Sequence, residues 1–270
     1  MRIGCCAYSF RRYLTSGEMT LEDFIDLASD LGIDGIELTS YYFPTTERDY
    51  LHSLKRRCLV RGIDVSGAAV GSKLTLASND ERAAEVRMVK EWLGHAVELG
   101  APELRVFAGV TPDGHTDEDA FGWAVAALRE CAPVAAEKGV VMALENHGGI
   151  TRTSAQVIRL IDAVDSEWLR VNLDTGNYGM DPDVDPYEGM RRVAPLSVTA
   201  HHKVSMKTPD GKKPVDIERV VSTLNEAGYR GFLNIEYEDD EDPKTAVPRV
   251  VEDIRQTLAR LGKNPDWPMS

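Results

Sequence analysis

The sequence has few cysteines and no long apolar run. Its 270 residues contain four cysteines, at positions 5, 6, 58 and 131, with no CxxC pair among them. That number and spacing do not suit a disulfide framework or a zinc ribbon, and they predict reduced thiols in a cytoplasmic protein. No run of about 18 apolar residues occurs, and "MRIGCCAYSF" lacks the pattern of a signal peptide. We therefore expect neither a membrane span nor a cleaved leader.

The chain also has fewer basic residues than acidic ones. The chain has 31 Lys and Arg against 44 Asp and Glu, which gives a formal net charge of −13. A surface of this sign repels phosphate backbones, so we expect neither nucleic acid nor an anionic membrane as a partner. Hydrophobic residues make up 43% of the chain, which is enough for the core of one large domain.

Eight short apolar segments alternate with amphipathic ones. The apolar segments lie at residues 2–10, 35–40, 64–70, 104–109, 140–147, 169–177, 197–204 and 232–238. The segments between them repeat apolar residues every three or four positions, as in "TLEDFIDLASDLG", where Thr20 suits an N-cap and Gly32 a helix end. Strands that alternate with helices predict parallel strands joined by right-handed crossovers.

Eight such units predict a single α/β domain, a (β/α)8 TIM barrel over residues 1–262, with a C-terminal tail at 263–270. A doubly wound open sheet is the alternative. That fold favours a glycine-rich first turn, and "AYSFRRYLTSG" is not glycine-rich. The barrel is therefore the preferred interpretation.

Polar residues end the last four predicted strands, where the active sites of such barrels lie. The residues that share a strand face there are Glu145 with His147, Asn172 with Asp174, His201 with Lys203, and Asn234 with Glu236 and Glu238. A buried carboxylate is costly without a partner, and crowded carboxylates repel one another unless a cation neutralises them. Three carboxylates and one imidazole suit Mn²⁺, Mg²⁺, Co²⁺ or Zn²⁺, so the pattern predicts a divalent metal site.

Each of these residues also has a structural interpretation. A strand-end glutamate can cap a helix or pair with an arginine, and Asp174 can form an Asx turn before Thr-Gly-Asn. Four independent structural roles at equivalent positions of successive strands are a less economical explanation than one shared cation. Between the adjacent histidines, His201 is preferred over His202 as a ligand because it shares its strand face with Lys203.

The motifs "ALENH", "NLDTGN", "AHHKV" and "GYRGFLNIEYEDDEDP" resemble the sugar phosphate isomerase/epimerase family of the xylose isomerase-like barrel superfamily, including ketose 3-epimerases and inosose dehydratase-type proteins. The resemblance extends from "CAYSF" to the last helix. It implies one divalent metal, with Mn²⁺ preferred, bound by Glu145, Asp174, His201 and Glu236. It also implies that the two glutamates act as acid/base groups on opposite faces of the substrate. Asn177 departs from the family pattern, in which many epimerases have a histidine, and Val204 replaces an acid.

These observations favour a metal-dependent isomerase or epimerase of a keto-sugar or cyclitol. Glu145 and Glu236 would move the proton α to a carbonyl, through a metal-stabilised enediolate. Further candidates for substrate binding are His147, Asn177, Lys203, Arg105 and His115. Arg105 can instead form an ion pair inside the barrel, and His115 can be an ordinary loop residue.

A lyase, dehydratase or deglycosidase acting on a keto-sugar is the main alternative, because Asn177 cannot carry a proton and His115 can assist a leaving group. An apurinic-site endonuclease is disfavoured by the negative charge and by the small number of histidines, six in all. A non-catalytic sugar-binding barrel would be indicated by a missing metal ligand, and none is missing. The sequence leaves open the sugar, the metal and the formation of a homo-oligomer.

Overall fold

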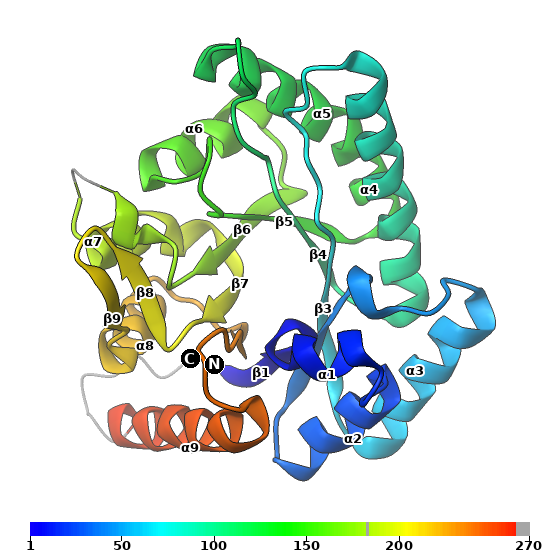
Figure 1. Cartoon of the computed structure of the whole chain (residues 1–270), viewed down its shortest axis with the longest axis vertical. Helices are drawn as coiled ribbons and strands as arrows, with labels where there is room; N and C mark the ends of the chain where they lie inside the picture. Colours follow the sequence, from blue (N-terminus) through cyan, green and yellow to red (C-terminus); the bar gives the residue numbers. More distant parts are fainter. Residues whose placement is uncertain (182–183, 263–270) are drawn as a thin grey trace.

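The computed structural model describes residues 1–181 and 184–262. Eight parallel strands close into a barrel in the order β1-β10-β7-β6-β5-β4-β3-β2, with helices outside them (Figure 1). The barrel strands are β1 (Arg2–Cys6), β2 (Gly35–Thr39), β3 (Asp64–Ala69), β4 (Glu103–Val106), β5 (Val141–Glu145), β6 (Leu169–Asp174), β7 (Ser197–His202) and β10 (Phe232–Ile235). The predicted fold class is confirmed, and each predicted apolar segment overlaps one barrel strand.

The helices surround the barrel in chain order. They are α1 (Arg11–Ser16), α2 (Leu21–Asp30), α3 (Arg48–Arg61), α4 (Asn79–Leu99), α5 (Asp117–Lys138), α6 (Ser154–Val164), α7 (Pro186–Val193), α8 (Ile217–Glu226) and α9 (Pro243–Leu261). Short 3₁₀ turns are η1 (Ala7–Phe10), η2 (Ser40–Tyr42), η3 (Tyr178–Met180) and η4 (Ala194–Leu196). Thr20 caps α2 as predicted, because its hydroxyl accepts the Asp23 N–H and the Asp23 carboxylate accepts the Thr20 N–H.

The first predicted strand was too long. It was expected to reach Phe10, but β1 ends at Cys6 and the chain turns into η1. Ser9 explains the turn, since its hydroxyl donates to the Ile235 carbonyl at 2.8 Å and accepts the Tyr237 N–H at 2.9 Å. These bonds hold the turn against the carboxyl end of β10.

A two-stranded antiparallel hairpin, β8 (Ser205–Thr208) with β9 (Gly211–Pro214), follows β7 and was not predicted. Its residues are largely exposed and have no apolar alternation, which is why periodicity did not reveal it. The turn signal was present as "TPDG", and Gly211 adopts a φ of 108°, which favours glycine.

Polar side chains occupy the barrel interior. Asn234 on β10 accepts a hydrogen bond from Ser66 on β3 at 2.9 Å and donates to Thr199 on β7 at 3.0 Å. β3 is not a neighbour of β10, so this contact crosses the barrel. Gly4 makes room for it, because a Cβ there would lie 1.9 Å from Oδ1 of Asn234. The apolar core instead lies largely between the strands and the helices.

Of the helices in the described residues, none combines the length and apolar content needed to cross a bilayer. The four cysteines are free, as expected, and all four are buried. The predicted tail at 263–270 lies outside the described residues. Its assignment, and the assignment of residues 1–262 to one domain, stay predictions.

Candidate metal centre and active site

Four of the predicted residues meet at the carboxyl ends of adjacent strands. Glu145 ends β5, Asp174 ends β6, His201 lies in β7, and Glu236 directly follows β10. One ligand atom from each lies within 4.8 Å of those of the others, and all four side chains are buried. Strand register brings them to one level, since Asp174 is paired with His201 across the β6–β7 ladder.

Both oxygens of Glu145 have partners. Oε1 lies 2.8 Å from Nδ1 of His147 and accepts from Nδ2 of Asn177 at 3.4 Å. Oε2 accepts from Nδ2 of Asn172 at 3.0 Å and lies 3.5 Å from Nε of Arg105. Burial opposes ionisation of Glu145, but Arg105 and His147 outweigh burial and lower its pKa. The strand therefore ends in a carboxylate that is ionised and oriented.

Lys203 is a buried cation among three carboxylates. Its Nζ lies 3.1 Å from Oδ2 of Asp174, from Oε2 of Glu236 and from Oε2 of Glu238. Burial acts to lower the pKa of Lys203, but these carboxylates raise it well above its usual value. Burial likewise opposes ionisation of Glu236, yet Lys203 and His201 hold its pKa well below the ordinary range. For Asp174 burial dominates, and its pKa is raised to about 7.

His201 is held from across the barrel by Glu37, a residue that the sequence analysis missed. Nε2 of His201 lies 2.8 Å from Oε2 of Glu37, whereas Nδ1 lies 3.5 Å from Oε2 of Glu145 and 3.6 Å from Oε1 of Glu236. The available signal was a carboxylate within the apolar segment "GIELTS". Glu37 leaves Nδ1 of His201 turned toward the carboxylates.

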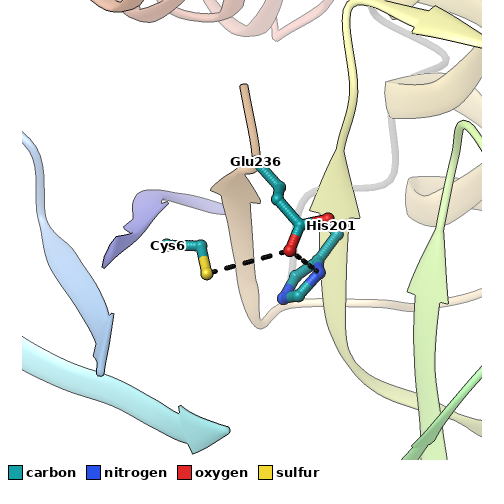
Figure 2. Close-up of side chains that lie close together, drawn as sticks. All are labelled: Cys6, His201 and Glu236. Atoms are coloured by element: carbon teal, nitrogen blue, oxygen red, sulfur yellow. Dashed lines mark hydrogen bonds and ion pairs between the residues drawn. The ribbon is translucent and has the colours of Figure 1, made fainter. Parts of the chain in front are cut away.

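Cys6 lies on the β1 side of the same cluster. Figure 2 shows the Glu236 carboxylate between Cys6 and His201. The thiol donates to Oε1 of Glu37 at 3.0 Å and lies 3.9 Å from Oε1 of Glu236. Burial raises the pKa of Cys6 well above its usual value, and the negative charge of Glu37 is the next largest cause. The thiol is therefore neutral.

The donors fit a divalent cation. Within the described residues, neither Nδ1 of His201 nor Oδ2 of Asp174 has a hydrogen bond, although both are buried and Lys203 stands 3.1 Å from that oxygen. Buried polar atoms nearly always have a partner, and a bound cation would provide one for both atoms. Three carboxylates with one imidazole are ligands that Mn²⁺, Mg²⁺, Co²⁺ and Zn²⁺ accept.

Three other candidates lie elsewhere. His202 is buried but is not in the cluster formed by described residues, and burial lowers its pKa to about 4. His115 is exposed and packs edge-on against Trp123 with ring centres 4.9 Å apart, so the structure does not bring it to the cluster. Tyr178, which a loop position would leave free to stack on a sugar, is fully buried against the protein.

A polar cavity of about 760 Å³ adjoins the cluster through Lys203, which lines the cavity and contacts Asp174 and Glu236. Its lining includes His147, Asn177 and Lys203, three of the predicted substrate-binding residues. The β8–β9 hairpin contributes Lys207 and Lys212 to the wall, so the unpredicted hairpin helps to shape the cavity. Its size and hydrogen-bonding groups suit a sugar.

Residues 25–260 match the family described as Xylose isomerase-like TIM barrel. The chain belongs to this family. Relatives that match it over most of their length include an inosose dehydratase from Clostridium botulinum, 23% identical over a 266-residue alignment that covers 86% of each chain. An L-ribulose-5-phosphate 3-epimerase from Escherichia coli is 23% identical over 273 residues, 94% of this chain and 95% of that one.

A shorter match is 32% identical over 122 residues to the 3'-dehydrocarminate deglycosidase alpha subunit of Microbacterium sp., covering 42% of this chain and 34% of that one. Among solved structures, D-psicose 3-epimerase from Clostridium cellulolyticum with D-tagatose has a TM-score of 0.79 at 17% identity, covering 96% and 99% of the chains. The IOLI protein with a zinc atom has a TM-score of 0.75 at 16% identity, covering 96% and 97%. These structures show the same fold.

Proposed function

We propose that this chain is a divalent-metal-dependent isomerase or epimerase of a keto-sugar or cyclitol. The observation that carries the proposal is the cluster of Glu145, Asp174, His201 and Glu236, whose ligand atoms lie within 4.8 Å of one another beside a polar cavity. The zinc atom in the IOLI structure and the epimerase names of relatives support it. When bound, a divalent cation supplies stabilisation for the negative charge that develops on a carbonyl oxygen as a neighbouring C–H bond breaks.

Glu145 and Glu236 are the proposed acid/base pair. Glu145 ends β5 and Glu236 directly follows β10 on the same rim. Each carboxylate is kept ionised by a buried cation, Arg105 beside Glu145 and Lys203 beside Glu236. One carboxylate takes the proton α to the carbonyl. The other takes up a proton from solvent before it gives that proton to the substrate, so the two groups exchange protonation states in each turnover. Lys203 lines the cavity. Its proposed role is to donate a hydrogen bond to the substrate oxygen that becomes negatively charged.

Metal content and proton exchange test this function. Elemental analysis of the wild type is expected to find about one Mn, Co, Zn or Mg per chain, and Glu145→Gln, Asp174→Asn, His201→Ala and Glu236→Gln to lose it. Glu238→Gln is the matched control, because Glu238 contacts Lys203 but lies outside the cluster of described residues. The loaded wild type is expected to exchange a substrate C–H proton with D₂O in a panel of keto-sugars. A metal-free wild type, or no exchange with any sugar, would reject the proposal.

A carbon–oxygen lyase on a keto-sugar is the second candidate. The amide of Asn177 donates to Oε1 of Glu145 at 3.4 Å and has no titratable proton, so one acid/base group that many epimerases have is absent here. The dehydratase and deglycosidase names among the relatives agree with this alternative. Release of water or of an aglycone, without epimer formation, would favour it.

The remaining assignments are part of the same proposal. We expect Mn²⁺ as the metal, a small carbohydrate as the partner, and neither nucleic acid nor membrane. The net charge of −13 and the free, buried cysteines support an acidic protein of the cytoplasm. The sequence leaves open whether the chain forms a homo-oligomer, and sedimentation would measure its oligomeric state.

A further inference from the structure

A second cavity, of about 390 Å³, lies on the same rim as the polar one. Its walls come from the segments that follow strands β2, β3, β4 and β5. The side chains that give it an apolar surface are Tyr41, Leu76, Phe107, Val110 and Pro112. This cavity has no role in the acid/base chemistry proposed above.

Large apolar side chains are exposed in this cavity although the surface is strongly charged. Val110 is 64% exposed and Tyr41 is 52% exposed, and both belong to the small set of large apolar residues exposed in the described chain. Tyr41 packs directly on backbone, since a Cβ at Gly71 would lie 2.3 Å from its hydroxyl oxygen. Exposed apolar groups that gather in a preformed hollow mark a binding site for an apolar ligand.

Two hydroxyl groups in the wall are already engaged. The Ser72 hydroxyl donates to the Phe107 carbonyl at 2.8 Å, and the Thr75 hydroxyl donates to the Val110 carbonyl at 2.6 Å. These bonds also tie the segment after β3 to the segment after β4. The wall is therefore shaped in advance and offers a ligand mainly carbon surface.

His147 joins this cavity to the polar one, because it lines both. Its ring stacks on Phe107 with ring centres 4.0 Å apart and planes 25° from parallel, and its Nδ1 is held by Glu145 at 2.8 Å. Tyr41 adds a third aromatic ring to the lining of the apolar cavity. A molecule whose sugar lies above Glu145 can extend past the His147 ring into the apolar cavity.

We propose that the apolar cavity binds an aromatic group attached to the sugar, so that an oxidised aryl glycoside is a better substrate than the free keto-sugar. This inference rests on the proposed function for the placement of the sugar. An aromatic ring matches the cavity because Phe107, His147 and Tyr41 present rings to it, and aromatic pairs add specific contacts to simple apolar burial. The substrate class is then set by the loops after β2 to β4, and the chemistry by β5 to β10.

The test compares two glycosides that differ in the attached group. Isothermal titration of the metal-loaded chain with 4-nitrophenyl β-glucoside and with methyl β-glucoside is expected to give at least about tenfold tighter binding of the aryl compound. Val110→Asp places a carboxylate on the apolar wall and is expected to remove this preference while leaving methyl glucoside binding unchanged. Val60→Asp, at an exposed valine on α3, is the matched control and is expected to keep it.

Equal affinity for the two glycosides, including no measurable binding of either, would overturn the proposal. So would an aryl preference that survives Val110→Asp. If that variant instead changes the sedimentation of the chain and leaves the preference intact, the cavity is an interface between copies, and the proposal also fails. An aryl preference without D₂O exchange would support the aryl-binding cavity and reject the proposed function. D₂O exchange without an aryl preference would support the proposed function and reject the aryl-binding cavity.

Discussion

Nε2 of His201 lies 2.8 Å from Oε2 of Glu37, and both side chains are fully buried. Glu37 comes from β2 and His201 from β7, which are not neighbours, so the pair spans the barrel. A carboxylate at one imidazole nitrogen orients the ring and makes the other nitrogen a better ligand. Nδ1 of His201 is thereby directed at Glu145 and Glu236.

Glu37→Gln is expected to weaken metal binding although all four proposed ligands remain. Loss of such an orienting carboxylate costs about 10–100-fold in metal affinity. Competition with a chelator of known affinity would measure the change. Glu103→Gln is the matched control, because Glu103 is another carboxylate buried in the barrel, and its oxygens accept no hydrogen bond from the described residues. Unchanged affinity in Glu37→Gln would show that Glu37 does not support the metal.

Removal of the metal is expected to destabilise the chain. At a free metal concentration of 100 times Kd, binding contributes about 2.7 kcal/mol. For a chain of this size that corresponds to a Tm lower by about 5–10 °C after chelation. Calorimetry with and without EDTA would measure the shift. Asp174→Asn is expected to melt at the same temperature in both conditions, and a metal-dependent Tm in that variant would contradict the assigned ligand set.

Lys203→Met is expected to be strongly destabilising without metal. The substitution leaves Asp174 and Glu236 buried without their cation, which costs about 3–5 kcal/mol. Urea unfolding in EDTA would measure the loss, and added Mn²⁺ is expected to reduce it. Lys212→Met is the control, because Lys212 pairs with Asp239 at the surface and its loss costs about 0–1 kcal/mol. Equal effects of the two substitutions would contradict a buried charge cluster.

The capping boxes predict a pH dependence of stability away from the site. The Thr20 N–H and hydroxyl bind the Asp23 carboxylate and lower its pKa in the folded chain. That contribution is therefore complete above the unfolded pKa, near 3.9, and is lost as the pH falls through the lower folded value. Asp23→Ala is expected to destabilise α2 at pH 7 and progressively less below pH 4.

Gln156 provides the control for that measurement. It occupies the same position in the capping box of α6, where its side chain accepts the Thr153 N–H, but it does not titrate. The cost of Gln156→Ala in urea unfolding is expected to be the same from pH 7 to pH 3. A parallel decline for Gln156→Ala would show that acid weakens both helices for another reason.

Much of the barrel could be predicted because its signals are local. Alternation of apolar segments with amphipathic ones gave all eight barrel strands, and strand periodicity placed Glu145 and His147 on one face. The same parity separated His201 from His202, and the structure brings His201 into the cluster. The β8–β9 hairpin escaped prediction because its exposed residues have no apolar period.

The sequence by itself determined the strand order along the chain and the donors at the strand ends, since both follow from short-range periodicity. Tertiary structure decided which residues support those donors. Glu37 and His201 are 164 residues apart in the chain, and only closure of the barrel brings them together. The same holds for the apolar cavity beside His147, whose walls come from four separate loops. Contacts between distant segments depend on how the barrel closes and packs, which no local pattern of residues records.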